Sequence, residues 1–207
     1  MIRSLLRQQS SNKSIHKLQS CVKSFSTQGT GIPYSDIKIG VPKETYPLEK
    51  RVAISPANVK NFIKEGFKAV NIESDAGASS FFSNEEYVEA GATIIPPGDA
   101  VLKDSDLILK VRPPTMEQVK AMGDDKTLIS YLYPGANTEL VEQLKAQKCT
   151  AFAMDCIPRT LSRGQTFDAL SSQANISGYR AVLEASHEFG RFFAGQMTAA
   201  GKVNFTL

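Results

Sequence analysis

The sequence lacks the features that mark several common classes of protein. No run among its 207 residues reaches the roughly 18 consecutive apolar residues that a membrane-spanning helix needs. Its three cysteines, Cys21, Cys149 and Cys156, are too few for a disulfide framework, and no histidine accompanies them at the spacing of a zinc site. We therefore predict no transmembrane helix within this chain and no metal site, and we expect the thiols to be reduced and buried.

Acidic residues are absent from the first 35 positions, and this uneven distribution explains the formal net charge of +3. Of the 24 basic residues, five precede Asp36, which leaves 19 basic and 21 acidic side chains in the remainder and a net charge of −2 there. A chain with this balance has no extended basic surface, so we do not expect it to bind nucleic acid.

The first segment has the composition of a mitochondrial transit peptide. It is rich in serine, it carries spaced arginines and lysines, and five apolar residues can share one face of a helix: Leu5, Leu6, Ile15, Leu18 and Val22. A secretory signal would need a continuous apolar core of about 7–15 residues, which this segment lacks. We interpret residues 1–30 as a transit peptide that is removed near residues 25–27, with a disordered basic tail as the alternative; N-terminal sequencing of the mature protein would distinguish them.

From residue 37 onward, short apolar runs alternate with amphipathic stretches. We expect strands at residues 37–41, 69–72, 92–95, 107–111, 128–132 and 151–154, and helices at residues 56–65, 83–90, 99–103, 115–122 and 139–147. Strands of nearly continuous apolar character that alternate with amphipathic helices are typical of a parallel sheet covered on both faces. We predict a doubly wound α/β domain, flavodoxin- or Rossmann-like, whose elements occupy about residues 36–160.

Several expected helix ends carry recognisable signals. Ser55 and Asn137 are predicted N-caps, and Ser83 stands in capping-box register with Glu86. Gly66 is predicted to end the first helix as a C-terminal glycine.

A longer amphipathic stretch follows residue 168. Between residues 171 and 193, apolar side chains recur at helical spacing, at Ile176, Tyr179, Val182, Leu183, Phe189 and Phe193. A helix of that length spans about 35 Å, which is long enough to bridge two domains. We therefore divide the chain into a leader (1–30), an α/β domain (31–167), and a long linking helix with the start of a second domain (168–207).

Charged residues gather where open α/β sheets hold ligands, at the carboxyl ends of strands. The loop after the first strand contains Glu44, Glu49 and Arg51. Arg51 can hold a carboxylate or phosphate through two parallel hydrogen bonds, although a solvated charged loop would have the same composition. Lys110 stands within the apolar run 107–111, where a lysine is costly unless it is paired, functional or able to extend to the strand end.

Five hydrogen-bonding residues stand just before and within the first turn of the long helix: Arg159, Gln165, Asp168, Ser171 and Ser172. A helix N-terminus presents free amide groups that attract acceptor groups, so this cluster is a candidate binding site. The alternative is that Asp168 or Ser171 only caps the helix.

Several motifs occur in an order that resembles a known enzyme module. They are residues 41–44 (VPKE), 49–56 (EKRVAISP), 109–114 (LKVRPP), 168–179 (DALSSQANISGY) and 190–193 (GRFF). Over about residues 36–203, the chain resembles the N-terminal module that alanine dehydrogenase shares with the NAD(H)-binding component of proton-translocating transhydrogenase.

Within that pair of families, the cluster before the long helix favours transhydrogenase. Arg159, Gln165 and Asp168 resemble the loop by which transhydrogenase orders the nicotinamide end of its bound nucleotide. The resemblance implies that Arg159 and Ser171 hold the nicotinamide carboxamide, and that Gln165 contacts the ribose where the NADP(H)-binding component docks. On this basis Gln165 and Asp168 are the candidate catalytic residues, and Arg159, Ser171 and Ser172 are the candidate cofactor-binding residues.

An alanine dehydrogenase-like amino-acid oxidoreductase is the alternative. In that family a histidine, which suits proton removal near neutral pH, follows the strand equivalent to residues 128–132. Here Tyr133 stands in that place, and the only histidine after the leader is His187 in the predicted long helix. Arg51 and Lys110 resemble the residues that hold the substrate carboxylate in alanine dehydrogenase, and in transhydrogenase we interpret them as relics or structural residues.

The resemblance implies hydride transfer from NADH to NADP⁺, coupled to proton translocation. It implies NAD(H) as cofactor, NADP(H) on the partner component, a membrane component, a homodimer, and a place on the matrix side of the mitochondrial inner membrane. A Rossmann nucleotide site needs G-x-G-x-x-G between a strand and a helix, and the sequence contains no such motif. We therefore expect the chain alone to bind NAD(H) weakly or not at all and to be inactive; a non-enzymatic interaction module is the third hypothesis.

Overall fold

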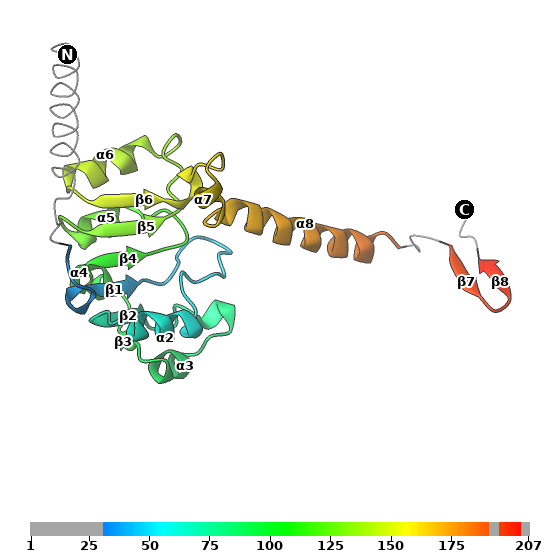
Figure 1. Ribbon diagram of the computed structural model, residues 1–207, viewed down its shortest axis with the longest axis horizontal. Helices are drawn as coiled ribbons and strands as arrows, with labels where there is room; N and C mark the ends of the chain where they lie inside the picture. The colour runs from blue at the N-terminus through cyan, green and yellow to red at the C-terminus, as the bar shows by residue number, and fades with distance from the viewer. Residues whose placement is uncertain (1–30, 191–194, 204–207) are drawn as a thin grey trace, which may run out of the picture.

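Six parallel strands form one sheet in a computed structural model that describes residues 31–190 and 195–203 (Figure 1). In chain order the strands are β1 (Lys38–Val41), β2 (Ala69–Glu73), β3 (Thr93–Ile95), β4 (Leu107–Leu109), β5 (Thr127–Ser130) and β6 (Thr150–Ala153). All six predicted strands are present, each within about two residues of its predicted ends. The predicted transit peptide, residues 1–30, lies outside the described residues.

Helices connect successive strands, and the spatial order of the strands is β3-β2-β1-β4-β5-β6. The connecting helices are α2 (Pro56–Lys64), α3 (Asn84–Glu89), α4 (Ala100–Asp104), α5 (Met116–Met122) and α6 (Thr138–Ala146). The chain therefore winds outward from β1 to β3, returns across the sheet to β4, and continues in the other direction to β6. This reversal between β1 and β4 confirms the predicted doubly wound α/β class.

Side chains alternate between the two faces of each strand, so neighbouring residues enter different cores. Ile39 of β1 packs with Val59 of α2 in one core cluster, whereas Ile108 of β4 packs with Val119 of α5 in the other. Helices therefore cover both faces, as predicted. Among the described residues, however, the α2 layer does not extend over β6, where Phe152 is 55% exposed.

Gly40 allows α4 and the turn that follows it to approach the centre of the sheet. A Cβ atom at position 40 would lie 2.4 Å from Ser105 Oγ and 3.2 Å from Val101 Cγ1. Any larger residue would have to displace α4, so this glycine determines how closely helix and strand pack.

Local signals at the helix ends are confirmed where they involve near neighbours. The Ser55 side chain accepts a hydrogen bond from the backbone N–H of Asn58, and Ser83 and Glu86 form a reciprocal capping box. Gly66 follows α2 with a φ of 90°, a left-handed conformation that favours glycine.

Two predictions that rested on single residues hold only in part or fail. Asn137 stands at the N-cap position of α6, as predicted, but its side chain makes no capping hydrogen bond, because its Nδ2 group donates to the carbonyl of Leu132 at 2.7 Å and holds the turn between β5 and α6. Cys156 is exposed, since it ends a surface turn (η3, Met154–Cys156) beyond β6, and Cys149 is only partly buried. Cys21 lies outside the described residues.

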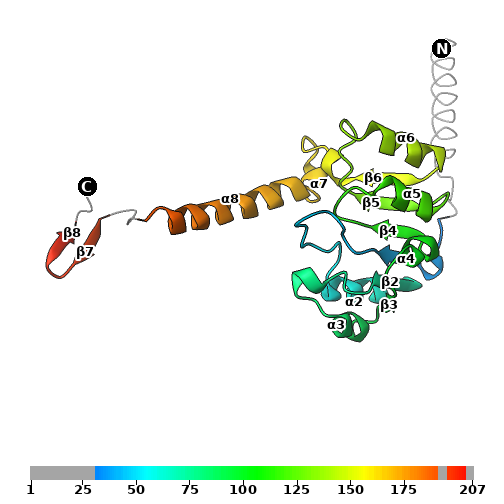
Figure 2. The same cartoon turned by 180° about the vertical axis from the view of Figure 1, so that it is seen from behind.

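The long helix α8, Ala169–Glu188, leaves the sheet domain and extends away from it (Figures 1 and 2). Its 20 residues span about 30 Å. It starts two residues earlier than predicted because Asp168 caps it, and it ends before the predicted residue 193, near Gly190 with a φ of 66°. None of its residues is buried, so the predicted apolar stripe, which includes Ile176, Tyr179 and Val182, is exposed.

A short antiparallel hairpin follows α8, formed by β7 (Gln196–Thr198) and β8 (Gly201–Val203). Within the described residues, no helix combines the length and the apolar character that crossing a membrane requires. The predicted domain boundaries at residues 31 and 168 stay predictions.

Candidate functional site

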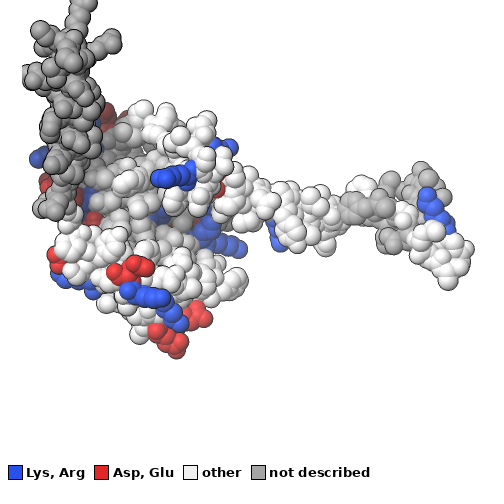
Figure 3. All heavy atoms as spheres, viewed as in Figure 1, with Lys and Arg blue, Asp and Glu red and all other residues white. Residues whose placement is uncertain are grey.

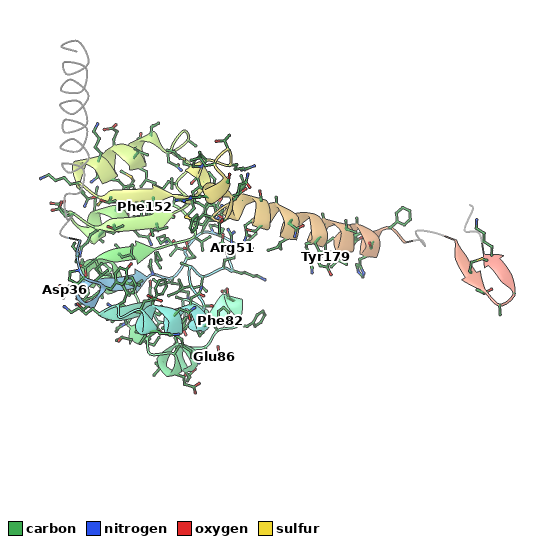
Figure 4. The ribbon with its side chains drawn as sticks, in the orientation of Figure 1. Asp36, Arg51, Phe82, Glu86, Phe152 and Tyr179 are labelled. Carbon is green, nitrogen blue, oxygen red and sulfur yellow. The ribbon has the colours of Figure 1, made fainter. Side chains whose placement is uncertain are left out.

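The candidate residues converge at the carboxyl end of the sheet. The loops after β1, β4, β5 and β6 lie at this end together with the start of α8 (Figures 1 and 4). Lysine and arginine atoms gather where α8 leaves the domain (Figure 3). Ligands of open α/β sheets bind at this end, beside the point where the winding reverses.

Asp168 is the centre of the cluster before α8. Its Oδ1 atom accepts a hydrogen bond from the Ser171 backbone N–H at 3.1 Å, and its Oδ2 atom accepts one from Ser171 Oγ at 2.5 Å. The guanidinium Nε of Arg159 lies 3.5 Å from the same Oδ2. The hydrogen bond from the Ser171 side chain, together with the Ser171 amide and the Arg159 charge, lowers the pKa of Asp168.

The structure brings four of the five predicted residues into one network. Gln165, in the short helix α7 (Ser162–Gln165), donates from Nε2 to the carbonyl of Arg159 at 3.1 Å and so shapes the loop. Ser172 differs, because its hydroxyl donates to the Ala169 carbonyl of its own helix. Asp168 therefore caps α8, and it also orients Arg159 and Ser171; whether these residues bind a nucleotide stays a prediction.

Arg51 belongs to a built network rather than to a solvated loop. Its Nε and Nη2 atoms each donate to one oxygen of Glu49 at 2.7 Å. Arg112 Nε donates to Glu49 Oε2 at 2.7 Å, and its guanidinium lies 4.5 Å from the centre of the Tyr46 ring. Hydrogen bonds from Arg51 above all, and from Arg112, lower the pKa of Glu49 to about 2.

Lys110 is paired inside the domain. Its Nζ atom lies 3.3 Å from Glu44 Oε2, and the two side chains are only 1% and 4% exposed. The other Glu44 oxygen accepts the backbone N–H of Val111 at 2.7 Å. Lys110 also lines a cavity of about 210 Å³ beside the start of α8, which Tyr131 and Ala169 share. The cost of burying this lysine is thus offset by a partner from the loop after β1.

Tyr133 is held in an unusual backbone conformation, with a φ of 48°. The Asp155 carboxylate accepts the backbone N–H groups of Leu132 and Tyr133 at 2.8 and 3.0 Å, which ties the end of β5 to the turn after β6. The Tyr131 and Tyr133 rings are nearly parallel, with centroids 6.2 Å apart. Burial raises the pKa of Tyr131. Two tyrosines therefore line the site beside Arg51.

A comparison with protein families shows where this arrangement belongs. The family described as alanine dehydrogenase/PNT, N-terminal domain, matches residues 40–177. The chain belongs to this family. Its relatives include the NAD(P) transhydrogenase subunit alpha of Haemophilus influenzae, 48% identical over 165 residues, which cover 80% of this chain and 31% of that protein. The crystal structure of transhydrogenase from Sinorhizobium meliloti superimposes with a TM-score of 0.72 at 38% identity, covering 80% of this chain and 47% of that one.

Alanine dehydrogenases are more distant relatives of this family member. The alanine dehydrogenase of Bacillus subtilis is 36% identical over 144 residues, which cover 70% of this chain and 36% of that protein. The similarity therefore favours the transhydrogenase branch, as the cluster of Arg159, Gln165 and Asp168 predicted. The chain spans about a third of the length of the Haemophilus subunit.

Sequence reasoning did not single out Asp155 or Gln173, and it named Glu44 in the charged loop without identifying its partner. Asp155 could have been found, since a carboxylate directly after a predicted strand lies at the sheet edge that binds ligands. The roles of Glu44 and Gln173 could not, because an acceptor in a charged loop and an amide in a helix do not indicate their partners. Their roles depend on contacts with Lys110 and Arg51, which come from distant parts of the chain.

Proposed function

We propose that this chain is the N-terminal part of a NAD(P) transhydrogenase and helps to hold NAD(H) during hydride transfer from NADH to NADP⁺. The observation that carries the proposal is the Arg159–Asp168–Ser171 network at the N-terminus of α8, at the carboxyl end of a doubly wound sheet. The relatives named transhydrogenase support the same reading.

The chemistry of these side chains suits a nicotinamide carboxamide, which offers one carbonyl acceptor and one amide donor. Arg159, whose side chain is 55% exposed, would donate to the carbonyl. The Ser171 hydroxyl, whose single proton goes to Asp168, would accept from the amide N–H, and Asp168 holds both residues in place. Gln165 would contact the ribose, and Ser172 would join them only after turning its hydroxyl away from Ala169. The cofactor supplies the hydride chemistry, and the protein's residues supply orientation.

The wider assembly is part of the proposal. NADP(H) would bind to a partner component, a membrane component would translocate protons, and the complete enzyme would be a homodimer. The acid-free, serine-rich residues 1–30 support a mitochondrial location, with this domain on the matrix side of the inner membrane. Because a G-x-G-x-x-G motif is absent from the sequence, we expect weak NADH binding by the chain alone.

A chimera tests the proposal. Residues 36–203 replace the matching region of the Haemophilus influenzae alpha subunit, and NADH affinity and hydride transfer to NADP⁺ are measured in the assembled enzyme. We expect transfer to be retained, and Arg159→Ala to weaken NADH binding by about tenfold, because a charged hydrogen-bond donor is lost. Lys145→Ala, which removes an exposed pair with Glu142, is the control and should change nothing. Unchanged NADH binding in both Arg159→Ala and Ser171→Ala would contradict the proposal.

An alanine dehydrogenase-like activity is the second candidate, and the cavity lined by Lys110 is the observation in its favour. The residue at position 133 argues against it, because a tyrosine stands where alanine dehydrogenase has the histidine that serves as general base. We expect no alanine-dependent reduction of NAD⁺ by the chimera, and measurable reduction would favour the second candidate. A non-enzymatic interaction module would show neither activity.

A further inference from the structure

The orientation of α8 is not determined by burial of the helix. None of its residues is buried, and the apolar side chains along it are exposed. The helix meets the domain mainly at its first turns, where Ala169 lines the cavity that Lys110 and Tyr131 share. The contacts made by these first turns therefore determine the orientation of Asp168 and Ser171.

Arg51 supplies such a contact. Its Nη1 atom donates to the side-chain oxygen of Gln173, in the second turn of α8, at 3.2 Å, across 122 positions of sequence. Figure 4 shows Arg51 beside the start of α8, with Tyr179 farther along the helix. The hydrogen bond is partly buried, so water competes with it less than at an exposed surface.

The Arg51 guanidinium is itself held rigidly. Two of its donors, Nε and Nη2, bind the Glu49 carboxylate, and so does the backbone N–H of Arg51. Glu49, whose side chain is 4% exposed, is fixed from its other side by Arg112. A planar guanidinium that is already oriented loses little further freedom when Nη1 binds Gln173. The loop after β1 thus presents a fixed donor to the helix.

The register of α8 links this contact to the candidate site. Ala169 and Gln173 are four residues apart, so they lie on one face of the helix, and that face is turned toward the domain. Ser171 lies about 200° around the helix axis from Ala169 and points back to Asp168. Any rotation of α8 that breaks the Arg51–Gln173 bond therefore turns Ser171 as well.

We propose that Arg51 is a positioning residue: through Gln173 it sets the direction and rotation of α8 and thereby aims Asp168 and Ser171. The link from this aim to nicotinamide binding rests on the function proposed above, whereas the link from Arg51 to the helix does not. Arg51 acts through another residue here, and no contact between Arg51 and a substrate is needed.

Spin labels on the full 207-residue chain test the structural part. The three cysteines are replaced by serine, and labels are attached to Lys64→Cys at the end of α2 and Ala185→Cys near the end of α8. Residue 185 lies about 24 Å along the helix from residue 169, so a tilt of about 15° moves it by about 6 Å. In the parent chain we expect one narrow distribution of the distance between the two labels. In Arg51→Ala and in Gln173→Ala the distribution should be broader by at least about 6 Å, the displacement that such a tilt produces.

Further variants separate positioning from general stability. The double variant should be no broader than either single variant, because both remove the same contact. Arg51→Lys keeps the charge, but one ammonium group cannot bind both Glu49 and Gln173 as the planar guanidinium does. We therefore expect the distance distribution of Arg51→Lys to be as broad as that of Arg51→Ala. Arg180→Ala is the matched control, since Arg180 pairs within α8 with Glu184 and should leave the distribution narrow. A narrow distribution in Arg51→Ala would overturn the proposal.

NADH affinity in the chimera tests the functional part. Arg51→Ala and Gln173→Ala should each raise the Kd for NADH by about fivefold, the equivalent of one hydrogen bond, and the double variant by about fivefold rather than about 25-fold. Helix movement without a change in Kd would overturn the link to the candidate site. If the parent chimera itself does not bind NADH, the proposed function fails, and the spin labels still decide whether Arg51 positions α8.

Discussion

Replacing Glu44 with glutamine removes the carboxylate that faces Lys110 inside the domain. Both side chains are almost fully buried, and Lys110 Nζ lies 3.3 Å from Glu44 Oε2. Glutamine has nearly the same size and can still accept the Val111 N–H through its carbonyl oxygen. The substitution leaves a buried ammonium without a counter-charge, and it turns an amide N–H₂ group toward Lys110 and the Arg112 N–H, which the second Glu44 oxygen accepts. It should cost about 3–5 kcal/mol of unfolding free energy.

Thermal and urea unfolding of the purified chain measure this cost. For a chain of this size the expected loss corresponds to a fall in Tm of about 6–20 °C. Adding Lys110→Met to Glu44→Gln should restore most of the stability, because the uncompensated charge is gone. Glu142→Gln, which removes the carboxylate of an exposed pair with Lys145, is the control and should cost less than about 0.5 kcal/mol. A Glu44→Gln chain that unfolds within about 0.5 kcal/mol of the parent would refute the reasoning.

Three further predictions concern Glu49, Gly40 and Asp168. The folded-state pKa of Glu49, about 2, lies below its ordinary value of 4.5, so its contribution to stability is present above about pH 4.5 and is lost as the pH falls toward 2; Glu49→Gln should flatten the acid-unfolding curve in that window. Gly40→Ala should cost about 1–3 kcal/mol in urea unfolding, because the new methyl group would overlap Ser105 Oγ, and Ser105→Gly should recover part of the loss. Asp168→Ala should remove about 1 kcal/mol of capping, seen as faster hydrogen exchange of the first-turn amides of α8; unchanged exchange there would contradict the capping role.

The helix signals show which local features could be predicted. Ser83 and Glu86 cap α3 as expected because the two residues are three positions apart and the helix itself brings them together. Asn137 has equally good capping chemistry, yet its amide is used by the Leu132 carbonyl. A side chain with several possible partners cannot be assigned from sequence when a nearby turn competes for it.

In the candidate site, too, residues close together in the sequence could be grouped, whereas contacts between distant residues could not be predicted. Arg159, Gln165, Asp168 and Ser171 could be grouped from sequence because they lie within a stretch of 13 residues that leads into the first turn of one helix. Lys110 was recognised as costly in its strand, but its partner Glu44 was not. The Arg51–Gln173 contact joins residues 122 positions apart and carried no signal in the sequence.

By itself the sequence determined the alternation of apolar strands with amphipathic helices, because side-chain periodicity and capping are set by neighbours along the chain. It therefore determined the α/β class and the length and place of most elements. Only the tertiary structure decided the order β3-β2-β1-β4-β5-β6 and the partners of Lys110 and Arg51. Charged groups can pair with many partners in solution, and only their positions at one edge of the folded sheet restrict each of them to a fixed few.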